Sequence, residues 1–390
     1  MNTEKIFNNT KIAFALKSNA ELDRAYYLFK MIANRPLVKI GTALTNFALK
    51  LRLPVIGLIR ITVFDHFCGG VNEKDCIPTI DRMYGARVCS VLDYSVEGKA
   101  SENQFDDATE RLIKIIEFSE KKDAMPIVVF KPTALGRFYL FQKKGEGKTL
   151  TTEEEAEWQR IIGRLDRLCK LSKFKDVEVL IDAEESWMQD TADEIVELMM
   201  ERYNKEVPYV YNTLQTYRWD RFDFLKASHE RAKRKGYKLG YKIVRGAYME
   251  KERERAIEKG YESPICRDKK TTDDNFNKCQ KYILENIEDI SIFVGTHNEE
   301  STYLAMQQME LLNINKEDNR VWFGQLYGMS DHISFNLAAK GYNVAKYLPF
   351  GPVKDVMPYL IRRAEENTSV AGQTSRELTL LDKERKRRRA

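Results

Sequence analysis

The sequence predicts an α/β fold, a distorted (βα)8 TIM-type barrel preceded by an N-terminal helical region. Eight short runs rich in apolar and β-branched residues recur along the chain, and longer polar stretches with helical periodicity separate them. Strands that alternate with helices pair in parallel, and eight is the number of strands that closes this barrel. A doubly wound open sheet is the alternative, but no G-x-G-x-x-G follows the first run, which weakens it.

A strand is expected at each of the eight runs. They are residues 86–95, 126–135, 176–184, 209–217, 241–248, 289–297, 321–328 and 343–351. The stretches between them carry helix-start chemistry. In one of them Thr151 and Thr152 precede three glutamates, and negative charge is favourable at a helix N-terminus. Residues 98–107 and 143–155 are expected to be loops.

Residues 1–85 precede the first expected strand and have a helical pattern, for example at 21–33 and 37–51. The second of these is amphipathic, so it either packs on its own domain, which is the commoner case, or lies on a membrane surface. The predicted domain organisation is therefore a helical region at 1–85, a (βα)8 barrel at 86–375 and a basic C-terminal tail at 376–390.

The net charge of +5 is concentrated at the C-terminus. Residues 383–389 carry six basic side chains and one acid, which accounts for the whole excess. The body of the chain is neutral, and this argues against a nucleic-acid-binding face on the fold. The tail is expected to be solvated and disordered. The alternative is that it contacts phosphates or an anionic membrane surface.

Several classes of protein and site are disfavoured by composition. The polar N-terminus lacks the apolar core of a signal peptide, and no run of 18 apolar residues could span a membrane. The six cysteines have no C-x-x-C spacing, so reduced thiols in a cytoplasmic protein are expected. The four histidines form no H-x-H or H-E-x-x-H pair, and no metal site is predicted.

Polar residues stand at the ends of the expected strands. In such a barrel the catalytic groups come from the C-terminal strand ends and the loops that follow them. Unusual polar or aromatic side chains occupy these places in seven strands: Lys131, Asp182, Gln215, Arg245, His297, Gln325 and Tyr347. A purely structural barrel does not need such a set in register, so a functional site is predicted at this end.

The helical stretch at 352–367 carries a second signal. Tyr359, Arg362, Arg363 and Glu366 have the i, i+3, i+4, i+7 spacing of one helix face. Two guanidiniums on one face suit a carboxylate ligand, because each can donate two parallel hydrogen bonds. Taken alone, a surface salt-bridge face with Glu366 is the simpler interpretation.

Together these segments resemble the proline dehydrogenase family. The matching pieces are FKPTALG (130–136), VLIDAEE (179–185), YNTLQTY (211–217), KIVRGAYMEKER (242–253), GTHN (295–298), GQLYGM (324–329) and YLPFGPVKDVMPYLIRRAEENTS (347–369). The resemblance runs from about Phe64 to the C-terminus. It implies a distorted (βα)8 barrel with noncovalent FAD at the strand ends. It also implies oxidation of L-proline to Δ1-pyrroline-5-carboxylate, with electrons passed to a membrane quinone.

The resemblance also implies the site residues. Substrate contacts are expected from Lys131, Tyr248, Tyr347, Tyr359, Arg362 and Arg363. Catalytic roles are expected for Asp182 and Lys242. Cofactor contacts are expected from Ile181, Gln215, Lys242, Arg245, Gly246, Ala247, Thr296, His297, Asn298, Gln325, Glu366 and Ser369.

Two alternatives within the enzymes remain open. One is a hydroxyproline dehydrogenase, although Tyr359 favours proline over its hydroxylated form. The other is a different flavin-dependent barrel, such as a folate reductase, which would need an electron source such as NADH. A separate polypeptide is expected to supply the downstream pyrroline-5-carboxylate dehydrogenase. The expected location is cytoplasmic, with a peripheral place at the inner face of the membrane also compatible.

Overall fold

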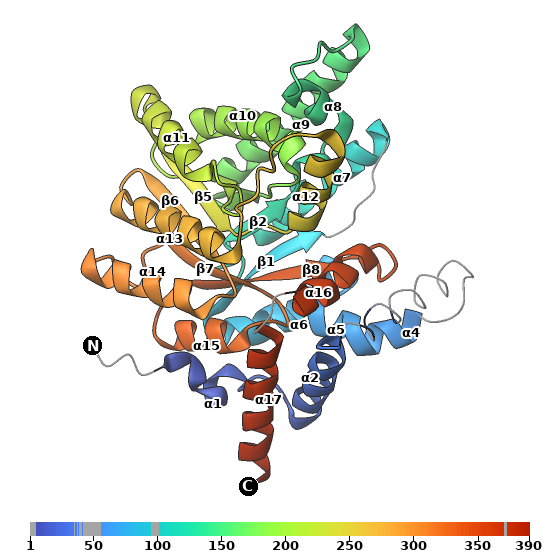
Figure 1. Ribbon diagram of the computed structural model, residues 1–390, viewed down its shortest axis with the longest axis vertical. Coiled ribbons are helices and arrows are strands. Elements are labelled where there is room, and N and C mark those ends of the chain that lie inside the picture. Colours follow the sequence, from blue (N-terminus) through green and yellow to red (C-terminus); the bar gives the residue numbers. More distant parts are fainter. Residues whose placement is uncertain are drawn as a thin grey trace. The chain divides into compact units, whose positions relative to one another are not determined.

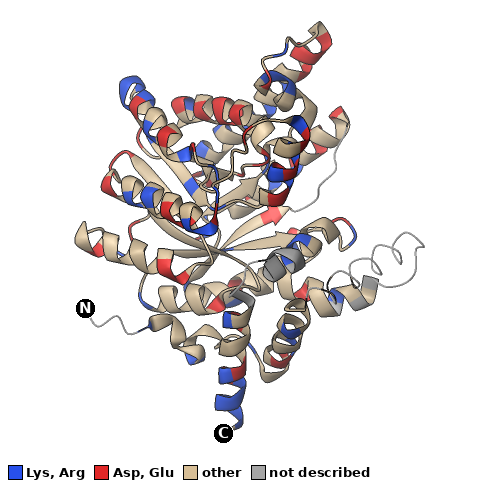
Figure 2. Cartoon of the chain, viewed as in Figure 1, with Lys and Arg blue, Asp and Glu red and all other residues tan. Residues whose placement is uncertain are grey.

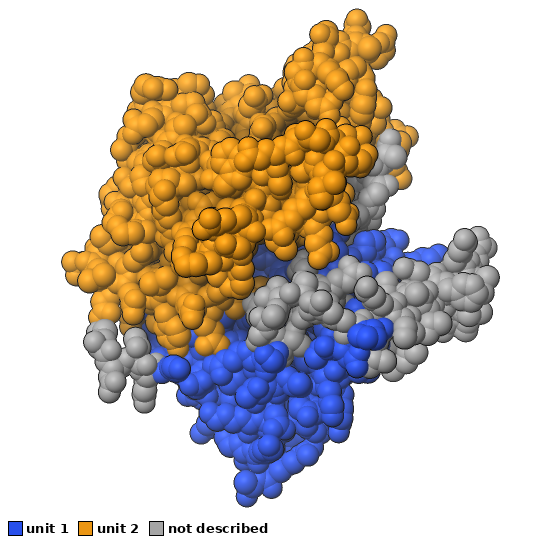
Figure 3. Space-filling view, viewed as in Figure 1, with its two compact units in different colours: residues 1–97, 324–390 blue, residues 98–323 orange. Residues whose placement is uncertain are grey.

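The computed structural model describes residues 5–34, 56–94, 101–369 and 373–390, together with residues 36, 38 and 41. The amphipathic stretch predicted at 37–51 therefore lies almost entirely outside the described residues. By their internal contacts the described residues form two compact units, coloured separately in Figure 3. Unit 1 comprises 1–97 and 324–390, and unit 2 comprises 98–323. The predicted domain boundaries at 85 and 375 stay a prediction.

In the described part of the chain, eight strands form a closed barrel in the order β1 to β8, and the paired strands are parallel (Figure 1). They are β1 Val88–Tyr94, β2 Ile127–Phe130, β3 Glu178–Ile181, β4 Val210–Gln215, β5 Leu239–Val244, β6 Ile290–Gly295, β7 Val321–Leu326 and β8 Val344–Phe350. Each overlaps one of the eight predicted ranges, so the predicted fold class is confirmed. All six residues of β4 are buried, as expected of a parallel strand covered on both faces.

Unit 2 carries β2 to β6 with their helices. These are α7 Glu102–Ser119, η3 Pro132–Ala134, α8 Phe138–Gly145, α9 Thr152–Lys175, α10 Ser186–Tyr203, α11 Arg221–Lys235, α12 Met249–Lys259, α13 Lys269–Glu285 and α14 Glu299–Leu311. The start predicted for the helix after residue 151 is confirmed, because the Thr151 hydroxyl accepts from the Glu154 N–H at 3.3 Å.

The two predicted loops in unit 2 are shorter than expected. A loop is predicted over 98–107, but α7 begins at Glu102, and the Ser101 N–H before it donates to the Gln104 side chain at 3.1 Å. The range 143–155 is a loop only between the end of α8 and Thr151. Both errors have one cause: capping residues are polar, so a helix start inside a polar stretch resembles a loop.

Unit 1 carries β1, β8 and the second half of β7. Its other elements are η1 Ile6–Asn8, α1 Thr10–Ala13, α2 Asn19–Ile32, α4 Ile56–Ile59, the π-helical turn η2 Arg60–Phe64, α5 Asp65–Phe67, α6 Glu73–Tyr84, α15 Asp331–Ala339, α16 Met357–Ser369 and α17 Gln373–Arg389. A capping box at Ser18 and Glu21 opens α2. The helical character predicted for residues 21–33 is thereby confirmed.

The expectation of a disordered C-terminal tail is wrong. Residues 373–389 form α17, whose basic end is visible as a cluster of blue residues in Figure 2. Leu380 and Leu381 are buried against α1 and α2, which gives the helix an apolar anchor. The basic residues that follow are paired: Arg385 donates to Asp23 at 2.5 Å, and Arg388 donates to the Phe14 and Lys17 carbonyls at 2.7 Å each.

None of the helices that the structure describes is both long enough and apolar enough to cross a membrane.

Candidate active site

The strand ends of unit 2 carry most of the predicted site residues. Gln215 is the last residue of β4, and Lys131, Asp182, Arg245 and Thr296 directly follow β2, β3, β5 and β6. Because these strands are parallel, their C-terminal ends face the same end of the sheet, as predicted.

Lys242 and Asp182 form an ion pair across two strands. Lys242 lies within β5 with its side chain only 7% exposed, and its ammonium hydrogen-bonds to Asp182 Oδ1. A charge so deeply placed needs a partner, because removing an ammonium group from water is costly. The pair therefore holds a positive charge at the strand ends in a defined position.

Arg245 ties the end of β5 to the helices beside it. Its guanidinium donates to Asp273 at 2.7 Å, to the Thr296 hydroxyl at 2.8 Å and to the Ser301 hydroxyl at 3.0 Å. It also lies 4.5 Å from the centroid of the Phe276 ring. Burial acts to raise the pKa of Asp273, but hydrogen bonds from Lys269 and Arg245 outweigh it and hold that pKa below its usual value. Arg245 is thus a rigid cation.

Glu184 links three strand ends and was not among the predicted site residues. Its carboxylate accepts from the Thr133 N–H at 3.2 Å and from the Thr133 hydroxyl at 2.9 Å. Its carbonyl accepts from the Gln215 side chain at 2.7 Å. Burial raises the pKa of Glu184 to about 7, while the charge of Lys131 acts to lower it. The sequence signal for this residue is its place in the Asp182–Glu185 run.

The chain passes Gly246 in a conformation that only glycine adopts easily, with φ +139°. A Cβ at this position would lie 2.5 Å from the Tyr217 ring. Tyr217 is buried, and its N–H donates to the Arg245 carbonyl at 2.7 Å. Gly246 and Ala247 themselves are exposed. The backbone here is consequently open to close approach by a ligand, and Tyr217 is the buried support that sequence reasoning missed.

Two buried polar atoms at these strand ends fit a bound polar ligand. Gln215 Oε1 and the Tyr217 hydroxyl have no hydrogen-bond partner among the described residues. Unsatisfied buried polar atoms are uncommon and costly in folded proteins, and a bound ligand is one way to satisfy them. With the cations Lys242 and Arg245 nearby, this combination of an acceptor, a hydroxyl and two positive charges suits a polar ligand that carries negative charge.

The predicted residues after β6 serve partly as structural anchors. The Asn298 side chain caps α14 by accepting from the Ser301 N–H at 3.0 Å. The Asn298 N–H donates to the Thr296 hydroxyl at 3.1 Å. His297, which lies between Thr296 and Asn298, is partly exposed. Ile181, another predicted cofactor residue, is buried at the end of β3.

In unit 1 the predicted residues lie on β7, β8 and α16. Gln325 accepts from the Ser334 hydroxyl at 2.8 Å, and the carbonyl of Tyr347 accepts from the Tyr327 N–H at 2.8 Å. On α16 the Arg363 guanidinium lies 5.2 Å from the centroid of the Tyr359 ring, which is buried.

The structure describes only part of the predicted helix face on α16. The partly exposed Arg362 lies beside Arg363 in the same helix. Pro358 lies in the first turn of α16, where a missing N–H costs nothing. The side chains of Glu366 and Ser369 lie outside the described residues.

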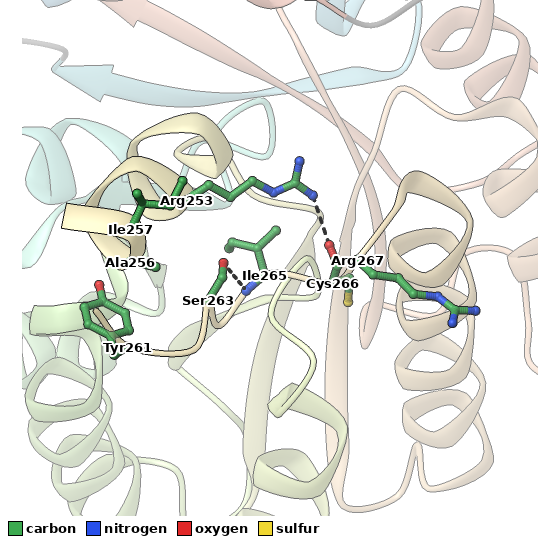
Figure 4. Close-up of a pocket in the computed structure, with 8 residues that line it drawn as sticks. All are labelled: Arg253, Ala256, Ile257, Tyr261, Ser263, Ile265, Cys266 and Arg267. Atoms are coloured by element: carbon green, nitrogen blue, oxygen red, sulfur yellow. Dashed lines mark hydrogen bonds between the residues drawn. The ribbon is translucent and has the colours of Figure 1, made fainter. Parts of the chain in front are cut away.

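A pocket of about 350 Å³ lies in unit 2 beside α12 and the linker that follows it (Figure 4). Its lining includes the apolar Ile257, the aromatic Tyr261 and the cations Arg253 and Arg267. Arg253 donates to the Cys266 carbonyl at 3.1 Å, the bond drawn as a dashed line in Figure 4. None of these residues was predicted. Among the described residues no cluster of His, Cys, Asp and Glu could hold a metal ion.

The family model for proline dehydrogenase matches residues 76–376, which is most of the chain. The chain belongs to the proline dehydrogenase family. It is accordingly an oxidoreductase, and the family resemblance of the sequence motifs is confirmed.

Relatives with different named functions are similar to this chain in sequence. The carbapenem antibiotics biosynthesis protein CarD of Pectobacterium carotovorum subsp. carotovorum is 36% identical over 83% of this chain and 83% of its own length. Mitochondrial proline dehydrogenase 1 of Arabidopsis thaliana is 30% identical over 98% of this chain and 85% of its own length. Hydroxyproline dehydrogenase of Xenopus laevis is 31% identical over 96% of this chain and 88% of its own length.

Among solved structures, the chain resembles proline utilization A from Bdellovibrio bacteriovorus inactivated by N-propargylglycine. The TM-score is 0.72 at 24% identity, and the likeness covers 94% of this chain but only 37% of that one. At this identity the comparison establishes the fold alone. The chain spans little more than a third of the solved protein.

Proposed function

We propose that the protein oxidises L-proline to Δ1-pyrroline-5-carboxylate with FAD as its cofactor and passes the electrons to a membrane quinone. The observation that carries this proposal is the set of strand ends in unit 2. There, exposed backbone at Gly246 adjoins two buried, unpartnered polar atoms and two fixed cations, in a chain of the proline dehydrogenase family.

The flavin is proposed to be held by the predicted cofactor residues at these strand ends. Gln215 Oε1 offers a free acceptor, and Gly246 and Ala247 allow the backbone to approach closely. When bound, the flavin supplies the acceptor for the hydride of the substrate C–H bond, a role that side chains cannot fill. Lys242, fixed by Asp182, and Arg245, fixed by Asp273, would hold positive charge beside the flavin and so favour its reduced, anionic form.

The substrate is proposed to be held by its carboxylate and its ring. Arg362 and Arg363 would bind the carboxylate as paired guanidiniums. The predicted aromatic contacts, from Tyr248, Tyr347 and Tyr359, would enclose the pyrrolidine ring and exclude water. Lys131 adds a cation after β2. Anchoring matters more than a strong base, because hydride transfer depends on the placement of one C–H bond.

Oxidation of proline needs only the substrate and the flavin, and a further reactant enters when the reduced flavin is reoxidised. The ring nitrogen of the neutral amine uses its lone pair to form the C=N bond as the adjacent C–H bond gives up a hydride. The remaining N–H proton is released to solvent, which leaves the imine. The quinone then takes up the two electrons.

The first test is optical. Purified protein should be yellow, and its absorption bands should bleach when L-proline is added under anaerobic conditions. It should also reduce a dye with L-proline as the electron donor. A flavin-free preparation that FAD does not reconstitute would contradict the proposal.

The second test addresses the two arginines. Arg362→Ala and Arg363→Ala should each raise the KM for proline. The reason is that each variant loses about 2–3 kcal/mol of charge-assisted binding free energy. Lys354→Ala, which removes an exposed cation preceding the same helix, is the matched control and should leave KM unchanged. Normal KM in both arginine variants would refute the carboxylate clamp.

A second candidate is oxidation of hydroxyproline. It is favoured by the 31% identity to the hydroxyproline dehydrogenase of Xenopus laevis. Tyr359, only 5% exposed, supports proline instead, because a bulky buried phenol leaves little room for an added hydroxyl. The ratio of kcat/KM for L-proline and trans-4-hydroxy-L-proline decides between them.

A further inference from the structure

Helix α12 begins directly after the predicted site residues Gly246–Tyr248 and carries a buried carboxylate that the proposed chemistry does not use. Glu252 is fully buried, whereas Glu250, Glu254 and Glu258 of the same helix are exposed. Both of its oxygens are occupied. One accepts from the Ser186 N–H at 2.6 Å, and the other accepts from the Ser186 hydroxyl at 2.6 Å. A carboxylate removed from water needs such contacts, so this is a specific docking point.

Ser186 is the first residue of α10, and that helix has no capping side chain of its own. Its N-cap residue is Glu185, whose side chain makes no capping hydrogen bond. Glu252 therefore brings from another helix the acceptor that a Ser, Thr or Asp N-cap normally provides. Its negative charge also suits the N-terminal end of α10.

Two neighbours of Glu252 strengthen the same contact. Lys251 pairs with Glu185, and the Arg255 guanidinium lies 4.4 Å from the centroid of a Trp187 ring. Three successive residues at the start of α10 are thus engaged by α12. The segment they occupy follows the strand end that carries Asp182 and Glu184. The contact consequently joins the loop after β3 to the loop after β5.

Both ends of α12 adjoin glycines with positive φ. Gly246 has φ +139° before the helix, and Gly260 has φ +71° after it. Such residues have more conformational freedom than any other, so they do not by themselves fix the direction of a helix. Contacts along α12 must do this, and the fully buried Glu252 makes its two with Ser186 of α10.

We propose that Glu252 is a positioning residue, which docks α12 on the N-terminus of α10 and thereby holds Tyr248 and the Gly246–Ala247 backbone in place for substrate and cofactor. This inference rests on the proposed function for its kinetic consequence, but the docking itself does not depend on that function.

The test uses the full-length protein and three variants. Glu252→Gln removes the charge while keeping the shape, Ser186→Ala removes one donor, and Glu254→Gln is the matched control on the exposed face of α12. In hydrogen–deuterium exchange, residues 245–259 should exchange faster in the first two variants. Residues 269–285 of α13 should be unchanged. The KM for proline should rise about ten-fold in Glu252→Gln, with kcat changed much less, because a misplaced binding wall weakens capture of substrate.

The double variant Glu252→Gln/Ser186→Ala should resemble Glu252→Gln alone, since both changes act on one contact. The proposal is overturned if exchange at 245–259 and KM match those of Glu254→Gln. Should Glu252→Gln fail to fold, Ser186→Ala alone decides, because it retains the backbone contact. If wild-type protein does not oxidise proline, the proposed function fails, and the exchange experiment still decides whether Glu252 docks α12.

Discussion

At the scale of single residues, Gly246 is a position where the backbone leaves little freedom for substitution. Gly246→Ala should lower the free energy of unfolding by about 1–3 kcal/mol. The substitution combines a strained φ with a Cβ that meets the Tyr217 ring. Gly236→Ala is a matched control: its φ is also positive, at +66°, but a Cβ there meets nothing within 4 Å. Bound flavin and thermal midpoint, measured together, should fall more in the first variant. Equal losses would show that the close approach to Tyr217 does not matter.

Glu184 should make stability depend on pH. Its pKa rises from 4.5 to about 7 in the folded protein, chiefly through burial. Between these values the folded state holds a proton that the unfolded state has lost. Its contribution to stability is thus fully present below about pH 4.5 and is lost as pH rises to about 7. The change is at most about 3 kcal/mol.

The check is chemical denaturation across this pH range. Glu184→Gln should flatten the fall in the free energy of unfolding between pH 4.5 and 7, since its amide does not titrate. The exposed Glu194→Gln should retain the wild-type slope. An identical slope in both variants would mean that Glu184 is ionised throughout.

At the scale of elements, α17 is the clearest departure from expectation. Arg385 donates to Asp23 and lies 4.0 Å from the centroid of the Tyr26 ring, whereas the side chain of Lys386 is 78% exposed. Arg385→Ala should therefore cost about 1–2 kcal/mol of stability, and Lys386→Ala should cost almost nothing. Denaturant midpoints compare the two. Equal, negligible effects would restore the prediction of a free tail.

The contrast between strands and site shows what local sequence can predict. The strands are predictable because a strand covered on both faces is largely apolar along its length, and that pattern is local. The charged run at 383–389 hid a helix because its partners, such as Asp23 and the Phe14 carbonyl, lie more than 350 residues away. The motif residues were located by resemblance. Glu184, Tyr217 and Glu252 were missed because their roles depend on contacts between distant segments.

At the scale of the whole molecule, most of the basic side chains at the C-terminal end are engaged by neighbouring groups. Arg387 and Arg388 both donate to the buried Glu384, at 2.7 and 2.8 Å. Charges held in this way contribute less to binding phosphates than free side chains do, because each would have to exchange one partner for another. The structure therefore gives the basic end a role in packing.

The closed barrel also determines which fragments are expected to fold. A fragment of residues 98–323 would contain β2 to β6 as complete strands, without β1 and β8. In a closed barrel every strand has two neighbours, so this fragment would expose unpaired edges at β2 and β6. Exposed edges of apolar, parallel strands invite aggregation, and parallel sheets are stable only when covered. Expressed alone, residues 98–323 should aggregate or lack a cooperative thermal transition. The full chain should be monodisperse and should unfold in one sharp thermal transition. Size-exclusion chromatography with circular dichroism decides this, and a monomeric fragment that melts cooperatively would show that unit 2 is an independent folding unit.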